Sequence, residues 1–461
     1  MFNKKLKIIF NMLNWNCNYL HKPPIWVSED LRDGNQSLIN GYDIKKKIKI
    51  WNLLLEIGIK QIVLGFPSSN KHDYNFINYL IKNKLIPNDV TVSILMPCKK
   101  NLIDLSYECI KSVKNVIFHL YNSVSKIQRK KVFNFNKKKT LNFTIDNIKY
   151  LIKKIKKKNY TIQYSPESFS DTELFFSKKI CFYYTYICYI NKIKSILNLP
   201  KTVENCLTNK YLNSINYIKK NIFNTMLSIH IHNDMNLSTS TSILSTLINI
   251  KRIEGTLFGN GERSGNVSIL ILASNYYNLG INPKINFFSK KFLKLFFNEK
   301  ISFLNKLPWY SRLNYCAFSG SHQDAIFKSF FKKKKFLWKI IYLPLNPKIY
   351  NFKYKNIIKI NSQSGRGGLK FIFWYNYNIL LDKIIINKIY SISQEISESL
   401  MCELHNNLLF VLFYNRSNFI KISYFKILKF LYSLLLNFKI IIFLIKKQKK
   451  KFFKIIFFKY E

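Results

Sequence analysis

The sequence has little glycine, little proline and few acidic side chains for its length. Its 461 residues include 13 Gly, 11 Pro and 24 Asp and Glu, whereas 48% of the residues are hydrophobic. That hydrophobic content excludes a disordered basic tail, because disordered chains are poor in the side chains that form a core. The length suits one large barrel-type domain with a smaller appendage, or about three average domains.

Basic residues are abundant, but arginine is rare among them. Lys and Arg together number 74, and the formal net charge is +50. The abundance of Lys, Asn, Ile, Phe and Tyr indicates mutational drift in a genome whose codons are AT-rich. The lysines are spread along the whole chain, with no zinc-finger spacing and no RNA-recognition signature. We therefore expect no specific nucleic-acid partner.

The eight cysteines form no CxxC pair and no regular framework, and the chain does not start with a signal-peptide pattern. They are typical of reduced thiols in the cytoplasm. The most apolar stretch, residues 430–445, contains Lys439 and falls short of the roughly 20 residues that a membrane-spanning helix needs. We expect a cytoplasmic protein with no membrane partner.

Against this background, glycine, arginine and histidine concentrate in a few short segments. Most of the glycines lie at four places: Gly34, residues 255–265, Gly320 and residues 365–368. In or beside these places, or at similar ones, lie Arg32, Arg252, Arg263, Arg366, His119, His230, His232 and His322. These segments have resisted the bias of the rest of the chain, which makes them candidates for function.

Short apolar runs rich in β-branched residues alternate with longer stretches of helical spacing. The runs are Ile25–Ser28, Gln61–Leu64, Thr91–Leu95, Val116–Leu120, Thr161–Tyr164, Ser195–Leu199, Leu227–His232 and Arg252–Leu257. This spacing predicts βα units with parallel strands, and their number fits an α/β fold, a TIM (β/α)8 barrel. Polar residues follow nearly every run, where the active site of such a barrel is built. A doubly wound open sheet is the competing interpretation.

The segment IHIHND contains two histidines two residues apart on an expected strand, His230 and His232. A strand places alternate side chains on one face, so the two imidazoles can share one cation. With a carboxylate such as Asp33 they form a set suited to Zn, Mn, Fe or Mg. An isolated HxH pair is also common by chance, and Asp234 either orients a ligand or caps the next helix.

The segment GTLFGNGERSGN, residues 255–266, is a glycine-rich loop before an apolar helical run. It matches neither common nucleotide-binding pattern, so a phosphate-binding loop is not expected. Glu262 and Asn266 are instead candidates to face the metal. The alternative is a tight connection between strand and helix that needs positive φ angles, and both can hold at once.

Eight segments follow one another along the chain: DLRDGNQ (30–36), HLYNS (119–123), YSPESFSDTEL (164–174), HIHND (230–234), EGTLFGNGERSGN (254–266), FSGSHQDAI (318–326), YLPLNP (342–347) and NSQSGRGG (361–368). In this order they resemble the 2-isopropylmalate synthase family, within the homocitrate synthase/HMG-CoA lyase-like superfamily. The resemblance covers residues 23–370. It implies a TIM barrel followed by linker subdomains, a divalent metal (Mg2+, Mn2+ or Zn2+), and condensation of acetyl-CoA with 2-oxoisovalerate.

The resemblance also implies residue roles. The metal ligands would be Asp33, His230, His232 and Asn266; the catalytic residues Arg32, Glu167, His322 and Tyr342; and the residues around the oxo acid Arg32, His119, Ser165, Glu167 and Thr202. In the family the His/Tyr pair reaches the active site of the other subunit, which implies a homodimer. A packed aromatic for Tyr342 and a helix cap for Thr202 are the structural alternatives.

The chemistry of the reaction is compatible with these residue types. Joining an acetyl methyl group to a ketone needs a base, an electrophile that polarises the ketone, and stabilisation of negative oxygens. Arg32 can stabilise such an oxygen, and His322 and Tyr342 can transfer protons in enolisation and thioester hydrolysis. A citramalate or homocitrate synthase, or a decayed barrel without activity, remains the alternative function.

The chain departs from the family pattern at three places. Met235 and Asn236 replace the usual Arg-Gly after HND, Arg366 replaces the usual Lys, and the tail lacks the glycine-containing pattern of a leucine-binding domain. We expect an altered rate and doubtful leucine inhibition. The expected organisation is an N-terminal segment (1–22), the barrel (23–290), linker subdomains (291–395) and a degenerate regulatory remnant (396–461).

Overall fold

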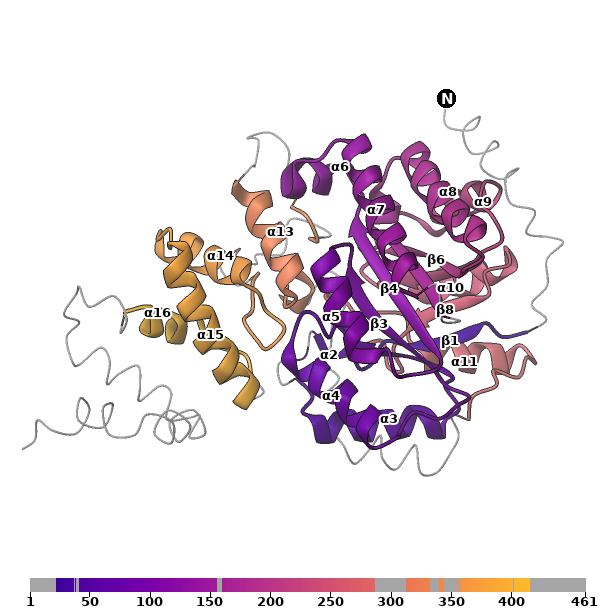
Figure 1. The fold of residues 1–461 in the computed structure, drawn as a ribbon, viewed down its shortest axis with the longest axis horizontal. Coiled ribbons are helices and arrows are strands. Elements are labelled where there is room, and N and C mark those ends of the chain that lie inside the picture. Colours follow the sequence, from indigo (N-terminus) through magenta and orange to yellow (C-terminus); the bar gives the residue numbers. More distant parts are fainter. Residues whose placement is uncertain are drawn as a thin grey trace, which may run out of the picture.

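The computed structural model describes residues 22–36, 38, 41–155, 160–286, 312–331, 340–343, 354, 357–400 and 402–414. Eight parallel strands close into a barrel in the order β1 to β8, each hydrogen-bonded to the next and β8 to β1 (Figure 1). The expected TIM barrel is therefore confirmed, and the open sheet is excluded. The apolar stretch at 430–445 lies outside the described residues.

The strands are β1 (Ile25–Ser28), β2 (Gln61–Gly65), β3 (Thr91–Pro97), β4 (Val116–Ser123), β5 (Thr161–Glu167), β6 (Lys194–Lys201), β7 (Met226–Ile231) and β8 (Arg252–Gly255). Each of β1 to β6 contains one of the expected apolar runs, and β7 and β8 overlap the other two. β4 and β5 continue into polar residues because their backbones still pair there, as Ser123 does with Glu167. β7 and β8 end earlier than expected, and a Cβ on Gly255 would lie 2.6 Å from the Val267 carbonyl, where the chain enters the glycine-rich loop.

Helices alternate with the strands and surround the barrel (Figure 1). They are α2 (Asp33–Gln36), α3 (Ile44–Glu56), α4 (Lys71–Lys82), α5 (Lys100–Ile110), α6 (Lys126–Gln128) with the π-helix Arg129–Phe133, α7 (Lys137–Ile155), α8 (Leu174–Ile190), α9 (Thr208–Lys219), α10 (Ser238–Leu247) and α11 (Ile269–Asn278), with a 3-10 turn at Phe169–Asp171. Side chains cap several of them: Asp43 accepts from the Lys46 amide at 2.7 Å and starts α3, and Asn70 accepts from the Asp73 amide at 2.7 Å and starts α4.

A second group of helices follows the barrel and lies to one side of it (orange and yellow in Figure 1). It consists of a 3-10 turn (Arg312–Tyr315), α13 (Gly320–Phe331), α14 (Arg366–Tyr377), α15 (Lys383–Leu400) and α16 (Asn406–Tyr414). We call the described residues 312–414 the linker region. It has its own apolar core, which includes Ile326, Phe371 and Leu409.

Glycines allow α13 and α14 to approach closely. A Cβ on Gly367 would lie 2.5 Å from the Asp324 backbone, and one on Gly320 would lie 2.7 Å from the Gly365 amide. Arg366 places its guanidinium over the Tyr390 ring, 5.2 Å from the centroid. The segment NSQSGRGG thus holds the helix that carries His322.

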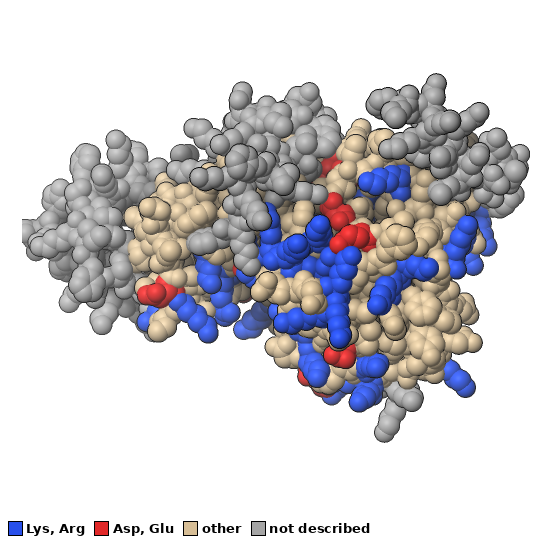
Figure 2. Space-filling model, turned by 90° about the horizontal axis from the view of Figure 1, so that it is seen from above, with Lys and Arg blue, Asp and Glu red and all other residues tan. Residues whose placement is uncertain are grey.

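Three further features are the thiols, the apolar character of the helices and the surface charge. The seven described cysteines, from Cys98 to Cys402, are free. Among the described helices none combines the length and apolar character needed to cross a membrane. Figure 2 shows basic side chains spread over the face in view, with few acidic ones between them.

Candidate active site

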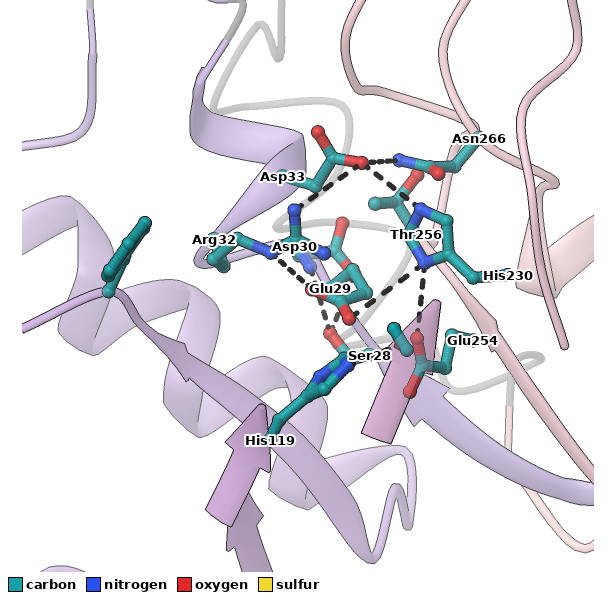
Figure 3. Close-up of polar contacts among 12 residues, drawn as sticks. Ser28, Glu29, Asp30, Arg32, Asp33, His119, His230, Glu254, Thr256 and Asn266 are labelled. Carbon is teal, nitrogen blue, oxygen red and sulfur yellow. Dashed lines mark hydrogen bonds and ion pairs between the residues drawn. The ribbon is translucent and has the colours of Figure 1, made fainter. Parts of the chain in front are cut away.

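The carboxyl ends of β1 and β7 bring a carboxylate and two imidazoles together. Asp33 begins α2 directly after β1, His230 lies in β7, and His232 follows that strand by one residue. Asp33 Oδ2 lies 3.4 Å from His230 Nε2 (Figure 3). The same oxygen lies 3.6 Å from His232 Nε2. All three side chains are buried. The strand geometry expected for the HxH pair therefore produces one shared cluster.

Asn266 completes this cluster from the glycine-rich loop. Its Nδ2 donates to Asp33 Oδ2 at 2.8 Å, while its Oδ1 is buried without a hydrogen-bond partner (Figure 3). Gly261, at φ +149°, makes room for it, because a Cβ there would lie 2.3 Å from Asn266 Nδ2. The loop is thus also the tight connection that the sequence suggested.

These residues fit a divalent metal ion. Bonds of about 2.0–2.2 Å place neighbouring ligand atoms around 3 Å apart, and the Asp33, His230 and His232 atoms are close to that spacing before any ion is present. The unpartnered Asn266 oxygen is a fourth possible ligand atom. Glu262 is not in the group of Asp33, His230 and His232. Its Oε1 accepts from the Ser319 amide at 3.0 Å in the linker region, and its Oε2 is buried without a hydrogen-bond partner. A role for Glu262 at the metal stays a prediction.

The charges around the cluster favour the metal-binding forms of Asp33 and His232. Burial acts to raise the pKa of Asp33, but Arg32 and the two histidines outweigh it and hold that pKa well below 3.8. Burial and the nearby Arg263 hold the pKa of His232 well below 6.5, so its imidazole is neutral. A neutral imidazole and an ionised carboxylate are the protonation states that ligate metals. Burial acts to lower the pKa of His230, but its contacts with Asp33 and Glu254 outweigh it and raise that pKa to about 9.

A layer of polar side chains beneath the cluster was missed by the sequence analysis. Glu254 in β8 lies 3.2 Å from His230 Nδ1 (Figure 3). It also accepts from three donors: Gln163 at 2.6 Å, Asn198 at 3.0 Å and Arg252 at 2.7 Å. Such a carboxylate orients a metal-binding histidine. The sequence signal that could have revealed this layer was the pair of charged residues Arg252 and Glu254 inside an apolar strand.

Arg32 and Glu29 form a second part of this layer. Arg32 Nε donates to Glu29 Oε2 at 2.8 Å, and its Nη1 lies 3.9 Å from Asp33 Oδ2. Burial raises the pKa of Glu29 to about 7, against the opposing effect of Arg32. Arg32 still lines the cavity, so its guanidinium can reach a bound molecule.

His119 and Ser165 lie on neighbouring strands and contact each other, with His119 Nε2 2.7 Å from Ser165 Oγ. Burial lowers the pKa of His119 to about 3, so the ring is neutral at physiological pH. The pair thus offers neutral hydrogen-bonding groups to the cavity rather than a charge.

Glu167, His322 and Tyr342 meet on the other side of the cavity. The Tyr342 hydroxyl donates to Glu167 Oε1 at 2.7 Å, and His322 Nε2 lies 3.7 Å from the same oxygen. The His322 and Tyr342 rings stack with centroids 3.8 Å apart. Burial acts to raise the pKa of Glu167, but His322, Ser123 and Tyr342 outweigh it and lower that pKa below 4.5.

This arrangement settles one structural alternative. Tyr342 is not a packed aromatic alone, because its hydroxyl also accepts from Gln128 Nε2 at 3.0 Å. Within one chain His322 and Tyr342 lie against Glu167, and the homodimer implied by the resemblance stays a prediction.

Thr202 lies beside the cavity and caps no helix. Its Oγ1 accepts from the Ser168 amide at 2.9 Å, and α9 begins six residues later, at Thr208. Asp234 likewise neither caps a helix nor contacts a ligand residue, since it accepts from Arg263 Nε at 2.9 Å and from the Glu204 amide at 2.9 Å. The cap proposed for either residue is therefore wrong.

One cavity collects nearly all of the expected site residues. Its lining includes Arg32, Asp33, His119, Ser165, Glu167, Thr202, His230, His232 and His322. Asn266 and Tyr342 lie behind this lining and contact Asp33 and Glu167, respectively.

Asn236, which departs from the family pattern, adopts φ +62°, a conformation that asparagine tolerates better than most residues. The loss of glycine there is thus accommodated.

Comparison with known families agrees with this geometry. The family model described as HMGL-like matches residues 23–293. The chain belongs to the HMGL-like family. A second model, "Alpha-isopropylmalate synthase, post-catalytic domain-like", matches residues 312–374, within the linker region.

Two relatives of this HMGL-like protein are named 2-isopropylmalate synthase. The protein of Acetoanaerobium sticklandii is 39% identical over 388 residues, which are 82% of this chain and 68% of the relative. That of Clostridium acetobutylicum is 36% identical over 430 residues, 90% and 77% of the two chains. A solved hydroxymethylglutaryl-CoA lyase from Pseudomonas aeruginosa is 15% identical with a TM-score of 0.48, over 58% of this chain and 89% of the lyase. The family makes this protein an enzyme that condenses an acyl-CoA with a 2-oxo acid.

Proposed function

We propose that this HMGL-like enzyme is a 2-isopropylmalate synthase, which converts acetyl-CoA, 2-oxoisovalerate and water into 2-isopropylmalate and CoA in leucine biosynthesis. One observation carries the proposal. The metal-binding cluster of Asp33, His230 and His232 faces the same cavity as Glu167 and His322, so an electrophile and a proton-transfer group flank one space. Condensation needs both of these at once.

The cavity walls support a 2-oxo acid with an apolar side chain. Phe66, Leu95, Tyr121 and Pro200 are among the lining residues. Among the described lining residues Arg32 is the one arginine or lysine, and it is already paired with Glu29 and Asp33. A second carboxylate, as in 2-oxoglutarate, would therefore lack a free cation. This favours 2-oxoisovalerate over the substrate of a homocitrate synthase.

Each part of the oxo acid has a matching group. Asp33, His230 and His232, with Asn266, would hold a divalent ion, which supplies a Lewis acid for the 2-oxo group when bound. Arg32 would stabilise the negative charge that develops on the ketone oxygen. The Thr202 hydroxyl would bind the carboxylate, and His119 and Ser165 would contact the rest of the substrate.

Proton transfer belongs to the other side of the cavity. The Glu167, His322 and Tyr342 group would accept a proton from the acetyl methyl group, and the new C–C bond joins that carbon to C2 of the oxo acid. The ketone oxygen then takes up a proton to become a hydroxyl. Water attacks the thioester carbonyl, and the C–S bond breaks to release CoA and the second carboxylate.

The setting of the reaction follows from the family and from the free thiols. We place the enzyme in the cytoplasm, where its seven described free cysteines would remain reduced, and expect a homodimer. The domain limits 1–22, 23–290, 291–395 and 396–461 remain predictions.

Thiol release from acetyl-CoA tests this function. The purified chain is assayed with 2-oxoisovalerate, pyruvate or 2-oxoglutarate, with and without a chelator, and with leucine. We expect chelator-sensitive release that is fastest with 2-oxoisovalerate and indifferent to leucine. Faster release with pyruvate or 2-oxoglutarate would instead assign a citramalate or homocitrate synthase. No release with any of them, from folded and metal-loaded protein, would leave a barrel without activity.

A further inference from the structure

Two ion pairs without appreciable exposure lie just beyond the carboxyl ends of β6 and β7. Lys201 Nζ donates to Glu204 Oε1 at 2.9 Å, and both side chains are 0% exposed. Arg263 Nε donates to Asp234 Oδ1 at 2.9 Å, and these side chains are 2% and 1% exposed. We call these four residues the buried charge quartet. None of them is among the residues that line the cavity.

The quartet joins two active-site loops through Glu204. The Glu204 amide donates to Asp234 Oδ2 at 2.9 Å, which connects the two ion pairs. Glu204 Oε2 accepts from the amides of Met235 at 2.7 Å and Leu237 at 3.2 Å. The loop after β6 is therefore fixed to the loop after β7 by two buried carboxylates, Glu204 and Asp234.

Both loops carry a residue of the proposed site. Lys201 and Glu204 flank Thr202, and Arg263 Nη2 donates to the Thr202 carbonyl. On the other loop, the His232 amide donates to the Lys201 carbonyl at 3.3 Å. The quartet thus holds the backbone on either side of Thr202 and contacts the backbone of His232.

Stability gives a weak reason for such an arrangement. Desolvation of two charges often cancels their attraction, and apolar replacements of a buried pair are frequently neutral or stabilising. A network of buried polar groups does, however, fix one geometry, because every alternative leaves a charge unpaired. A fixed geometry matters here because the Thr202 hydroxyl and the His232 imidazole belong to one proposed site.

We propose that the buried charge quartet is a positioning device that sets the separation of Thr202 and His232. Its members touch neither substrate nor metal, yet they determine how well the carboxylate of the oxo acid and the metal ion are bound together. The inference rests on the proposed function in assigning the oxo-acid carboxylate to Thr202.

The test replaces the Lys201–Glu204 ion pair with apolar side chains. In the double variant Lys201→Met/Glu204→Leu both charges leave together, so no unpaired charge stays buried. We expect the KM for 2-oxoisovalerate to rise at least tenfold and the Kd for Mn2+, measured from the spin-resonance signal of free Mn2+, to rise severalfold. The KM for acetyl-CoA should stay within twofold. Lys201→Arg, which keeps the charge, should restore values close to those of the unchanged enzyme.

Tyr184→Phe is the matched control for a simple loss of stability. The buried Tyr184 hydroxyl donates to the carbonyls of Ile162 at 2.9 Å and Ile196 at 3.0 Å, in β5 and β6 but away from the cavity. This variant should lower Tm and leave both KM values and the Mn2+ affinity unchanged.

Two results would overturn the inference. One is a double variant with an unchanged KM for the oxo acid and an unchanged Kd for Mn2+. The other is a double variant whose kinetic constants change only as those of Tyr184→Phe do at an equal loss of Tm. If the unchanged enzyme releases no thiol with any oxo acid, the proposed function fails, and the Mn2+ titrations then decide the inference by themselves.

Discussion

The two sides of the cavity are built in different ways. The proposed metal-binding side, Asp33, His230 and His232, comes from the barrel alone, and its charged groups are fixed by the layer around Glu254. The proposed proton-transfer side joins Glu167 of β5 to His322 and Tyr342 of the linker region. One side depends on strand register, and the other depends on how two parts of the chain pack. Substitutions should therefore affect metal affinity and turnover separately.

Asp33→Ala should have the largest effect. It removes the carboxylate that both histidines approach and leaves His230 with one fewer acidic neighbour. We expect loss of stoichiometric metal and at least a 10³-fold fall in thiol release, because the Lewis acid goes with it. Metal content after dialysis and the initial rate measure both. Full metal retention would show that the cluster is not the binding site.

Glu167→Gln should lower turnover while leaving the metal in place. The amide keeps the size of the side chain but cannot accept a proton, and loss of general acid-base catalysis typically costs about 10²–10⁴-fold. Manganese affinity should match that of the unchanged enzyme, which separates this variant from Asp33→Ala. A fall in metal affinity as large as the fall in kcat would mean that the two sides are not independent.

Tyr342→Phe should have a smaller effect that does not depend on pH. Burial and the adjacent Glu167 raise the pKa of Tyr342 well above 10, so the hydroxyl stays protonated at every pH below that value. The substitution therefore removes a hydrogen-bond donor and never a charge. We expect kcat to fall about 10–100-fold, a modest share of acid-base catalysis. The ratio of kcat for Tyr342→Phe to kcat for the unchanged enzyme should be constant from pH 6 to pH 9. A ratio that changes tenfold over this range would contradict the role of Tyr342 as a neutral hydrogen-bond donor.

Gly320→Ala should have the smallest effect, which comes from a shift of the linker region relative to the barrel. A Cβ there would lie 2.7 Å from the Gly365 amide, so α13 and its His322 must shift. We expect kcat to fall a few fold, with a stability loss of about 1–3 kcal/mol and unchanged metal affinity. Gly280→Ala is the control, because a Cβ there meets nothing within 4 Å although its φ of +79° disfavours alanine. Equal falls in kcat for Gly320→Ala and Gly280→Ala would show that the close contact between α13 and α14 does not position His322.

The metal-binding side was open to prediction from local patterns. Alternation along β7 put His230 and His232 on one face, and polar residues after β1 supplied Asp33. All eight strands were likewise visible as apolar runs. Such patterns report directly on which side chains a strand turns inward.

Residues whose role depends on distant partners were not open to such prediction. Glu254 and Gln163 are polar residues inside barrel strands, and only closure of the barrel brings them together at 2.6 Å. Glu262 Oε1 likewise accepts from the Ser319 amide of the linker region. No local period encodes a contact between segments so far apart in the chain.

The sequence by itself determined the alternation of strands and helices, the resemblance to one family and the chemical types of the site residues. Hydrophobic periodicity and side-chain chemistry are local properties, so they can be read without coordinates. Only the tertiary structure decided which carboxylate orients His230, that the Tyr342 hydroxyl contacts Glu167, and that Lys201 and Glu204 form a buried pair. Those outcomes depend on packing and desolvation across long sequence separations, where burial sets the energy of each charge.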